Sequence, residues 1–197
     1  MQSKPWRRMW HLLGGSFFPI IAVFIPRKTL LITVGAITAV FVTWEVVRFT
    51  YSRVNQSMVS YLGVILKTKE TSRPTGTSYL LLASLIAFLS FEKYVAISCL
   101  LFLSVGDAMA TIIGEKYGRR RLFNKSLEGS LACLLVCLLI GVIMVVGGRV
   151  MLLPVAVVGA VTATMAELLP FPVDDNLTIP IFSGGAMTLT DFVLARL

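Results

Sequence analysis

The run of residues that decides the fold is 127–146, which reads LEGSLACLLVCLLIGVIMVV. Its one charged residue, Glu128, is near the start, and a transmembrane helix needs about 20 consecutive, predominantly apolar residues. The whole chain shares this character, because 56% of its 197 residues are hydrophobic and only 14% are charged. Soluble domains carry about 25% charged residues. We therefore predict an integral membrane protein with no soluble domain of any size.

Six more apolar runs, separated by polar segments, make up most of the remaining chain. Together the runs predict an all-α, polytopic integral membrane helical bundle of about seven transmembrane helices, with residues 1–197 as one membrane-embedded core. A basic segment precedes the first run, as in a signal peptide. No small-residue cleavage site follows it, and Pro19 and Pro26 interrupt the run, so we expect a retained first helix. The expected spans are 12–25, 30–47, 78–91, 94–113, 127–146, 150–169 and 179–194.

Residues 48–77 form the one long polar stretch of the sequence. Apolar residues alternate there with basic ones such as Lys67 and Lys69, which fits an amphipathic helix on the membrane surface. A plain connector is the alternative. Just before this stretch, Glu45 and Arg48 are three residues apart, the spacing of an ion pair on one helix face.

The basic residues give the expected orientation. With these spans, the N-terminus and the loops at about 48–77, 114–126 and 170–178 lie on the same side of the membrane. That side carries 13 of the 18 basic residues, so the positive-inside rule places it in the cytoplasm. These charges are scattered over membrane-edge loops without a recognised binding module, which argues against nucleic acid as a partner. The 13 residues are Lys4, Arg7, Arg8, Arg48, Arg53, Lys67, Lys69, Arg73, Lys116, Arg119, Arg120, Arg121 and Lys125.

Six of the ten acidic residues fall in two short stretches at the edges of apolar runs, within 106–130 and 167–176. Charge at a membrane boundary is costly without partners, so such clusters are candidates for a functional site. The spans 127–146 and 150–169, turned at residues 147–149, form a helical hairpin between the two stretches. Two crossings return the chain to the same face. We therefore predict that both stretches meet in one cytoplasmic site.

The first stretch combines a buried carboxylate with a basic loop. Asp107 follows Gly106 in an otherwise apolar helix, and such a carboxylate can hold Mg²⁺ or act as a base. In the loop at about 114–126, glycines would allow the backbone to approach an anion that the lysines and arginines neutralise. The loop lacks the Walker pattern. The predicted nucleotide-binding residues are Gly114, Lys116, Gly118, Arg119, Arg120, Asn124, Lys125, Ser126 and Gly129.

The helix that follows this loop adds a second phosphate-binding feature. Ser126 or Asn124 can cap it, and the free N–H groups at a helix N-terminus favour an anion. Glu128 lies in the first turn, where a carboxylate is favourable. It is either a capping group only or a catalytic residue that helps to bind the metal.

The second stretch supplies further carboxylates. Glu167 ends a span, two prolines follow, and Asp174-Asp175-Asn176 precedes the last span. Adjacent carboxylates with an amide oxygen are hard ligands suited to Mg²⁺, which would bridge phosphate oxygens. Alternatively, Asp175 or Asn176 only caps the last helix. We predict Asp107, Asp174 and Asp175 as catalytic and metal-binding residues, and Glu167 and Asn176 as further site residues.

The sole histidine, His11, lies one turn after two arginines at the start of the first span. It would bind a substrate phosphate or relay a proton, or it is only an interface residue. With one histidine so placed, a Ser-His-Asp or Cys-His set is not expected. Cys99, Cys133 and Cys137 lie in apolar runs and are expected to be buried thiols, without disulfides or zinc.

In type and order, these motifs resemble those of the CTP-dependent lipid-alcohol kinase family, which includes dolichol and polyprenol kinases, phytol kinase and the CTP-type diacylglycerol kinase. The resemblance covers essentially the whole chain, and in the family the Lys-Ser-x-Glu-Gly-Ser segment belongs to the region associated with CTP binding. The short, single-core form looks prokaryotic and is similar to the C-terminal core of the longer eukaryotic dolichol kinases. The matching pieces are Arg7-Arg8-x-x-His11, Gly106-Asp107-x-x-Ala110, Gly114-x-x-x-Gly118-Arg119, Asn124-Lys125-Ser126-x-Glu128-Gly129-Ser130 and Glu167-x-x-Pro170 followed by Asp174-Asp175-Asn176.

The resemblance implies an Mg²⁺-dependent enzyme that transfers the γ-phosphate of CTP to a membrane isoprenoid alcohol such as a polyprenol or dolichol. Diacylglycerol and phytol are alternative acceptors, and a cytidylyltransferase that makes a CDP-lipid is an alternative enzyme. A small transporter or scaffold would need polar residues along several helices, whereas here they crowd at one membrane face. The expected partners are a nucleotide, a lipid alcohol and a prokaryotic cell membrane. The sequence leaves the oligomeric state open, and a homodimer is one of the alternatives.

Overall fold

The computed structural model describes residues 5–62, 68–147 and 152–196, with the side chains of 5–8, 10, 62, 68 and 69 excepted. Lys4, Lys67 and the turn residues Gly148 and Arg149 therefore lie outside the described residues, as do the side chains of Arg7 and Arg8. The described helices and strands, in chain order, are α1 (Pro5–Phe24), α2 (Arg27–Thr50), α3 (Ser52–Leu62), η1 (Thr68–Thr71), α4 (Gly76–Ser90), α5 (Lys93–Leu101), η2 (Phe102–Asp107), α6 (Ala108–Tyr117), β1 (Arg121–Leu122), β2 (Lys125–Ser126), α7 (Leu127–Val146), α8 (Leu153–Leu168) and α9 (Asp175–Leu194).

The helices follow the predicted apolar runs. Four described segments are long and apolar enough to cross a membrane, and they are Arg27–Thr50, Lys93–Tyr117, Leu127–Val146 and Asp175–Leu194. Three shorter apolar helices cover His11–Phe24, Gly76–Ser90 and Leu153–Leu168. Within the described residues, these seven segments confirm the predicted all-α membrane bundle.

The last helix begins at Asp175, earlier than the predicted start at residue 179. The carboxylate of Asp174 accepts a hydrogen bond from the backbone N–H of Asn176, so Asp174 is the N-cap. A capping carboxylate satisfies an N–H that has no partner inside the helix. Pro180 then lies within the first turns of α9.

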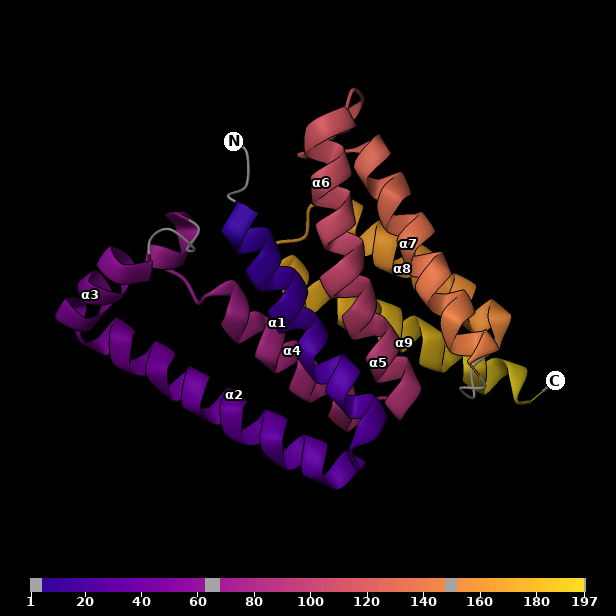
Figure 1. Ribbon diagram of the computed structural model, residues 1–197, viewed down its shortest axis with the longest axis horizontal. Coiled ribbons are helices and arrows are strands. Elements are labelled where there is room, and N and C mark those ends of the chain that lie inside the picture. Colours follow the sequence, from indigo (N-terminus) through magenta and orange to yellow (C-terminus); the bar gives the residue numbers. More distant parts are fainter. Residues whose placement is uncertain (1–4, 63–67, 148–151, 197) are drawn as a thin grey trace.

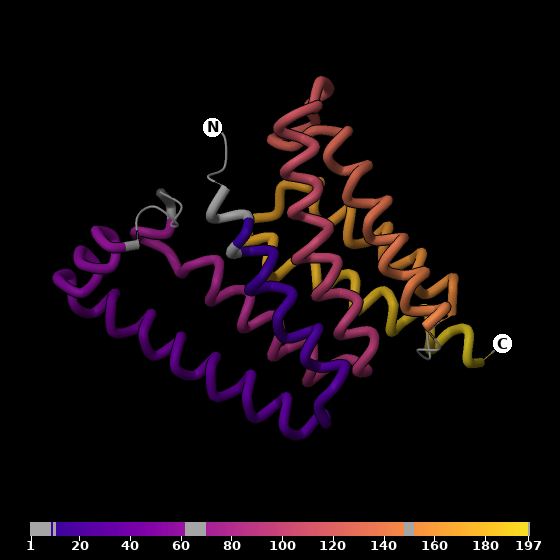
Figure 2. The backbone as a smooth tube through the Cα atoms, viewed as in Figure 1, coloured from indigo at the N-terminus to yellow at the C-terminus, as the bar shows by residue number. Residues whose placement is uncertain are grey.

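Lys93–Tyr117 is one continuous helical segment that runs through the middle of the bundle (Figures 1 and 2). Of its apolar window, 61% is buried inside the protein, against 22% for α2, which lies at the outer edge. The segment is α-helical in α5 and α6 but π-helical in η2 between them. Helix α1 packs against α5, α7 packs against α6 and α8, and α9 packs against α8 and α4.

A close contact in η2 explains the positions of two cysteines. A side chain at Gly106 would come within 2.8 Å of Cys137 Sγ and 3.2 Å of Cys133 Sγ. The two sulfur atoms are 3.9 Å apart on one face of α7, and both thiols are free and buried, as predicted. Gly106 is thus required for the close approach of η2 and α7.

A buried polar network joins α2 to the segment before α4. Arg48 is fully buried and donates to Glu45 Oε2 at 2.6 Å, which confirms the predicted ion pair. Its guanidinium also donates to the backbone oxygens of Glu70 and Arg73, at 3.0 and 2.7 Å. Glu45 Oε1 accepts from the backbone N–H of Thr75 at 2.8 Å. This network fixes the return of the chain from α2 to α4.

Of the two alternatives for the long polar stretch, a helix is found over Ser52–Leu62. This helix, α3, turns back against the end of α2 (Figure 1). Met58 is buried against the protein, whereas Tyr61 is 83% exposed. An amphipathic helix that begins at the end of a spanning helix is placed to lie at the membrane surface.

Candidate active site around Lys125

Lys125 brings together the two acidic stretches. Its Nζ lies 2.8 Å from Asp175 Oδ2 and 3.0 Å from Glu167 Oε1. The lysine comes from β2, Glu167 from the end of α8 and Asp175 from the start of α9. The helical hairpin of α7 and α8 therefore returns the chain to the same end of the bundle, as its two crossings predict.

The surroundings of Lys125 favour the charged form of its amine. Burial would lower the pKa of this amine, but the charges of Asp107, Asp175 and Glu167 outweigh that effect and raise the pKa well above its ordinary value. Lys125 is consequently a permanent cation at any physiological pH. Its side chain is 30% exposed, so it remains accessible to a ligand.

Glu167 is the buried anchor of this cluster. Its side chain is 3% exposed, and both carboxylate oxygens have partners. Oε1 contacts Lys125, and Oε2 accepts a hydrogen bond from Ser130 Oγ in the first turns of α7 at 2.8 Å. Glu167 therefore ties the loop lysine to both helices of the hairpin. Ser130 belongs to the motif noted in the sequence, but its role as the partner of Glu167 could not be read from a separation of 37 residues.

Asp107 ends the π-helical turn and faces α1. Its Oδ2 is 3.5 Å from His11 Nε2, and both side chains are about one-fifth exposed. The pair is too long for a good hydrogen bond, and His11 Nε2 has no hydrogen-bond partner among the described residues. Three residues earlier, Ser104 bonds to Ser16 of α1 at 2.9 Å. This contact holds α1 against η2 and sets His11 beside Asp107.

The π-helical turn is a feature that the sequence did not predict. One extra residue per turn changes which face of the helix the following residues occupy, and single π-turns are frequent at functional sites. Here the turn places Asp107 between His11 on α1 and Lys125, on which the charge of Asp107 acts. The Gly106-Asp107 pair, which the sequence analysis singled out, lies at the end of this turn.

The predicted glycine-rich basic loop contains a short β-hairpin. β1 and β2 pair antiparallel, with Arg121 opposite Ser126 and Leu122 opposite Lys125. The turn between them includes Phe123, whose φ of 54° is in the left-handed region. The hairpin fixes the direction in which Lys125 leaves the loop. Arg119, Arg120 and Asn124 are exposed beside it.

The loop glycines have a packing role. A side chain at Gly114 would lie 2.7 Å from Ser126 Oγ, and one at Gly129 would lie 2.5 Å from the backbone oxygen of Ala110. At Gly118 a side chain would collide with the backbone of Gly114. These three glycines allow α6, the hairpin and α7 to pack together. Their predicted part in phosphate binding stays a prediction.

The start of α7 is capped as expected. Ser126 Oγ accepts from the backbone N–H of Gly129 at 3.1 Å. Glu128 accepts from the backbone N–H of Arg120 at 3.2 Å, so this carboxylate holds the loop to the helix. Lys116 lies over the ring of Tyr117, with 5.0 Å between Nζ and the ring centroid. Within the described part of the chain, neither Glu128 nor Lys116 contacts Lys125, Glu167 or Asp175.

The neighbouring aspartates have different roles, although the sequence treats them as a pair. Asp174 caps α9 and also accepts from Asn176 Nδ2 at 2.7 Å, whereas Asp175 pairs with Lys125. The cap of α9 is therefore Asp174, and the alternative in which Asp175 or Asn176 only caps this helix is wrong. Asn176 Oδ1 is buried and has no hydrogen-bond partner among the described residues. A side chain at Gly76 would come within 3.0 Å of Asn176 Nδ2, so the start of α4 borders the site.

The donor set suits a cation that is shared with a phosphate ligand. No group of three or more His, Cys, Asp or Glu side chains in the described ranges is arranged to hold a metal by itself. Asp107 and Asp175 both lie near Lys125, and Mg²⁺ is usually held by one or two carboxylates together with substrate phosphates. The residues present therefore fit Mg²⁺ bound jointly with a nucleotide.

Comparisons with known proteins found relatives that are lipid kinases. Residues of this chain are 31% identical over 168 positions to the CTP-dependent diacylglycerol kinase 1 of Eremothecium gossypii, covering 71% of this chain and 52% of the relative. The enzyme of the same name from Saccharomyces cerevisiae is 29% identical over 168 positions, with 71% and 57% covered. The chain therefore spans little more than half the length of these two relatives.

A third relative matches along nearly its full length. An uncharacterized protein of Rickettsia prowazekii is 23% identical over 194 positions, which cover 95% of each chain. No family model and no solved structure matches this chain.

Proposed function

Because the chain belongs to the CTP-dependent lipid kinase family, we propose that it transfers the γ-phosphate of CTP to the hydroxyl group of a membrane lipid alcohol. Diacylglycerol is the first acceptor to consider, since two of the relatives are named as diacylglycerol kinases. An isoprenoid alcohol, which the motifs suggested, is the second. The observation that carries the proposal is the convergence of Lys125 with Glu167 and Asp175 from separate elements.

Lys125 is placed to bind the phosphates of the nucleotide. It is a permanent cation, partly exposed, at the end of a hairpin that also presents Arg119 and Arg120. Phosphoryl transfer needs positioning and charge neutralisation more than covalent participation by the protein. In the described state Lys125 is paired with Asp175, so a phosphate oxygen would take the place of one carboxylate contact.

Asp107 and His11 are placed to handle the acceptor. The lipid hydroxyl would approach between α1 and η2, where Asp107 Oδ2 orients it and takes its proton. The lipid oxygen then forms a bond to the γ-phosphorus as the bond from that phosphorus to the β–γ bridging oxygen breaks, and CDP leaves. His11 Nε2, 3.5 Å from Asp107 and without a hydrogen-bond partner in the described part of the chain, can relay this proton.

Asp107 and Asp175 would hold Mg²⁺ together with the phosphates, and Oδ1 of Asn176, buried without a hydrogen-bond partner among the described residues, would supply a further oxygen ligand. The bound metal would neutralise charge on the β- and γ-phosphates. Glu167 acts through Lys125, whose position it fixes, and Asp174 acts through α9, which it caps.

The site is proposed to face the cytoplasm, where CTP is available. The loops at this end of the bundle carry most of the basic residues, which is the pattern of cytoplasmic loops. The chain would then be an integral protein of a prokaryotic cell membrane. The acceptor tail would lie among the helices, with its hydroxyl group at this membrane edge.

Differently labelled CTP tests the reaction. The full chain, purified in detergent, is incubated with Mg²⁺ and mixed micelles that contain dioleoylglycerol, a polyprenol, phytol or phosphatidate. A lipid kinase moves label from the γ position of CTP into the lipid phase and leaves the α label in water. The α label would enter the lipid in a cytidylyltransferase reaction, and that result with phosphatidate as the acceptor would overturn the proposal.

Variants separate the site from its surroundings. Lys125→Met should abolish the transfer of γ label. The matched control, Lys28→Met, removes an exposed lysine from the first turn of α2 and should retain wild-type turnover. Equal turnover of the Lys125 variant and the control would contradict the role of Lys125.

A further inference from the structure

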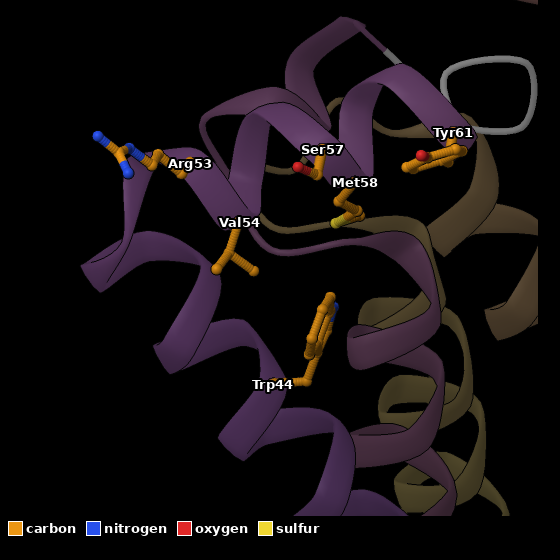
Figure 3. A pocket seen from close by; sticks show the side chains of 6 residues that line it. All are labelled: Trp44, Arg53, Val54, Ser57, Met58 and Tyr61. Atoms are coloured by element: carbon orange, nitrogen blue, oxygen red, sulfur yellow. The ribbon is translucent and has the colours of Figure 1, made fainter.

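A pocket on the outer side of the bundle lies apart from the Lys125 cluster. It is an open groove of about 510 Å³ between α2 and α3, lined by Trp44, Arg53, Val54, Ser57, Met58 and Tyr61 (Figure 3). Small-molecule sites have volumes of about 300–1,000 Å³ and mostly apolar walls. We name it the α2–α3 pocket, and the proposed reaction uses none of its residues.

The position of the pocket makes lipid the natural occupant. Helix α2 is long enough to span a membrane, and only 22% of its apolar window is buried inside the protein. The pocket therefore opens beside a helix whose exposed face meets acyl chains. Trp44 rises from α2 toward Met58, and Tyr61 lies along α3 (Figure 3). Tryptophan and tyrosine are enriched where membrane and water meet, which favours a position of the pocket at headgroup depth.

Arg53 supplies the charge that selects the headgroup. It is exposed, it extends outward at the edge of the pocket (Figure 3), and it forms no hydrogen bond or ion pair with the residues that the structure describes. A guanidinium group binds a phosphate strongly, often through two hydrogen bonds. Basic side chains beside a spanning helix attract anionic lipids. Mostly apolar walls with the guanidinium of Arg53 at the rim match an acyl chain joined to a phosphate.

We propose that the α2–α3 pocket binds a phospholipid with an anionic headgroup from the surrounding leaflet, with part of an acyl chain in the pocket and the phosphate at Arg53. A second copy of this chain fits less well, because a stable protein interface uses about 20–30 residues on each side. The pocket offers six lining residues. Arg48, near the end of α2, is joined to the segment before α4 through the backbone oxygens of Glu70 and Arg73, so a bound lipid would also stabilise this corner of the fold.

Quenching of tryptophan fluorescence by brominated lipids tests the proposal. Trp6 and Trp10 are replaced by phenylalanine, which leaves Trp44 as the one tryptophan. The protein is placed in nanodiscs of phosphatidylcholine. About 10 mol% of their lipid is either acyl-brominated phosphatidylglycerol or acyl-brominated phosphatidylcholine. We expect stronger quenching of Trp44 by the anionic lipid than by the zwitterionic one at the same content.

Two variants identify the parts of the site. Arg53→Gln should reduce the preference for phosphatidylglycerol by about fivefold, the effect expected for one basic residue at a membrane surface. Ser57→Phe should fill the pocket and reduce the quenching by both lipids while leaving Arg53 in place. The control, Lys28→Gln at the other end of α2, should keep the wild-type preference. Circular dichroism in the same nanodiscs checks that each variant is folded.

Equal quenching of Trp44 by the two brominated lipids in the parent protein would overturn the proposal, as would an unchanged preference in folded Arg53→Gln. A dimer that is lost in Ser57→Phe, together with equal quenching, would assign the pocket to a second copy instead. Since no nucleotide is present in this experiment, its outcome does not depend on the proposed kinase activity.

Discussion

Loss of Lys125 should destabilise the protein through Glu167, and this effect can be separated from the loss of activity. In Lys125→Met, the carboxylate of Glu167 remains 3% exposed but loses its cationic partner at 3.0 Å. Ser130 still donates to its other oxygen. A carboxylate buried without a counter-charge is costly, whereas a neutral amide of the same shape is not. Adding Glu167→Gln to the lysine variant should therefore restore stability.

The geometry sets the size of the effect. Two unit charges 3.0 Å apart attract each other by about 5–6 kcal/mol at an effective dielectric constant of about 20. Lys125 is 30% exposed and shares its charge with Asp175, so solvent screens part of this energy. We expect a loss of about 3 kcal/mol, at the lower end of the about 3–5 kcal/mol for breaking buried pairs. For a chain of this length that corresponds to a decrease in Tm of about 6–12 °C.

The buried cysteines provide the assay. Cys99, Cys133 and Cys137 are free and buried, so a thiol-reactive fluorophore reports unfolding in detergent. We expect Lys125→Met to lower Tm by the stated amount and Lys125→Met/Glu167→Gln to recover at least half of it. Both variants should lack transfer of γ label, because neither has a cation at this position. Glu167→Gln alone should stay close to the wild-type Tm, since Lys125 keeps Asp175.

The pH dependence gives an independent check. The charges around Lys125 raise its pKa in the folded state, and in the unfolded chain a lysine has a pKa of about 10.4. A raised pKa contributes stability that is fully present below the unfolded value and is lost as the pH rises through the folded value. The difference in Tm between wild type and Lys125→Met should thus be constant from about pH 6 to 9. An equal Tm for the two proteins, or no recovery in the double variant, would refute the reasoning.

Three further outcomes follow from the site and its packing. Asp107→Asn should lower the transfer of γ label by at least about 100-fold with little change in Tm, because Asp107 is partly exposed; turnover near that of wild type would remove Asp107 from the mechanism. Gly129→Ala should cost about 1–3 kcal/mol, seen as a lower Tm, because its side chain would lie 2.5 Å from the Ala110 oxygen. Gly185→Ala is the control, since a Cβ added there would meet no described atom within 4 Å outside its own helix turn. Removal of Mg²⁺ by EDTA should abolish the increase in Tm that CTP produces in the presence of Mg²⁺, and an undiminished increase would show that CTP binds without the metal.

Much of the architecture could be predicted because lipid imposes it. Within a bilayer every backbone polar group must be satisfied internally, so apolar runs of sufficient length become helices. The two crossings between Lys125 and Asp175 then bring these residues to the same end of the bundle. The Glu45–Arg48 pair was also predictable, since it depends only on the local helical spacing.

The details of the site depend on contacts between distant residues and could not be predicted. Nothing in the sequence distinguishes Asp174 from Asp175, because their difference arises from where α9 begins and which side chain then faces Lys125. The π-helical turn before Asp107 likewise depends on how closely Gly106 approaches α7. The packing role of Gly114 and Gly129, where an added side chain would come within 2.7 Å of Ser126 Oγ and 2.5 Å of the Ala110 oxygen, depends on such contacts too.

The charges around Lys125 also bear on the order of binding. Asp107, Glu167 and Asp175 all act on the one amine of Lys125, so this cluster has more carboxylates than cations. A triphosphate that arrived alone would meet these carboxylates at short range and would have to compete with Asp175 for Lys125. Exposed Arg119 and Arg120 can attract it to the hairpin, but attraction at the rim does not neutralise the interior. A cation that accompanied the phosphates would reduce this repulsion and, by pairing with Asp175, would leave Lys125 to the phosphates. The pairing of Lys125 with Asp175 would thereby select a metal–nucleotide complex over the free nucleotide.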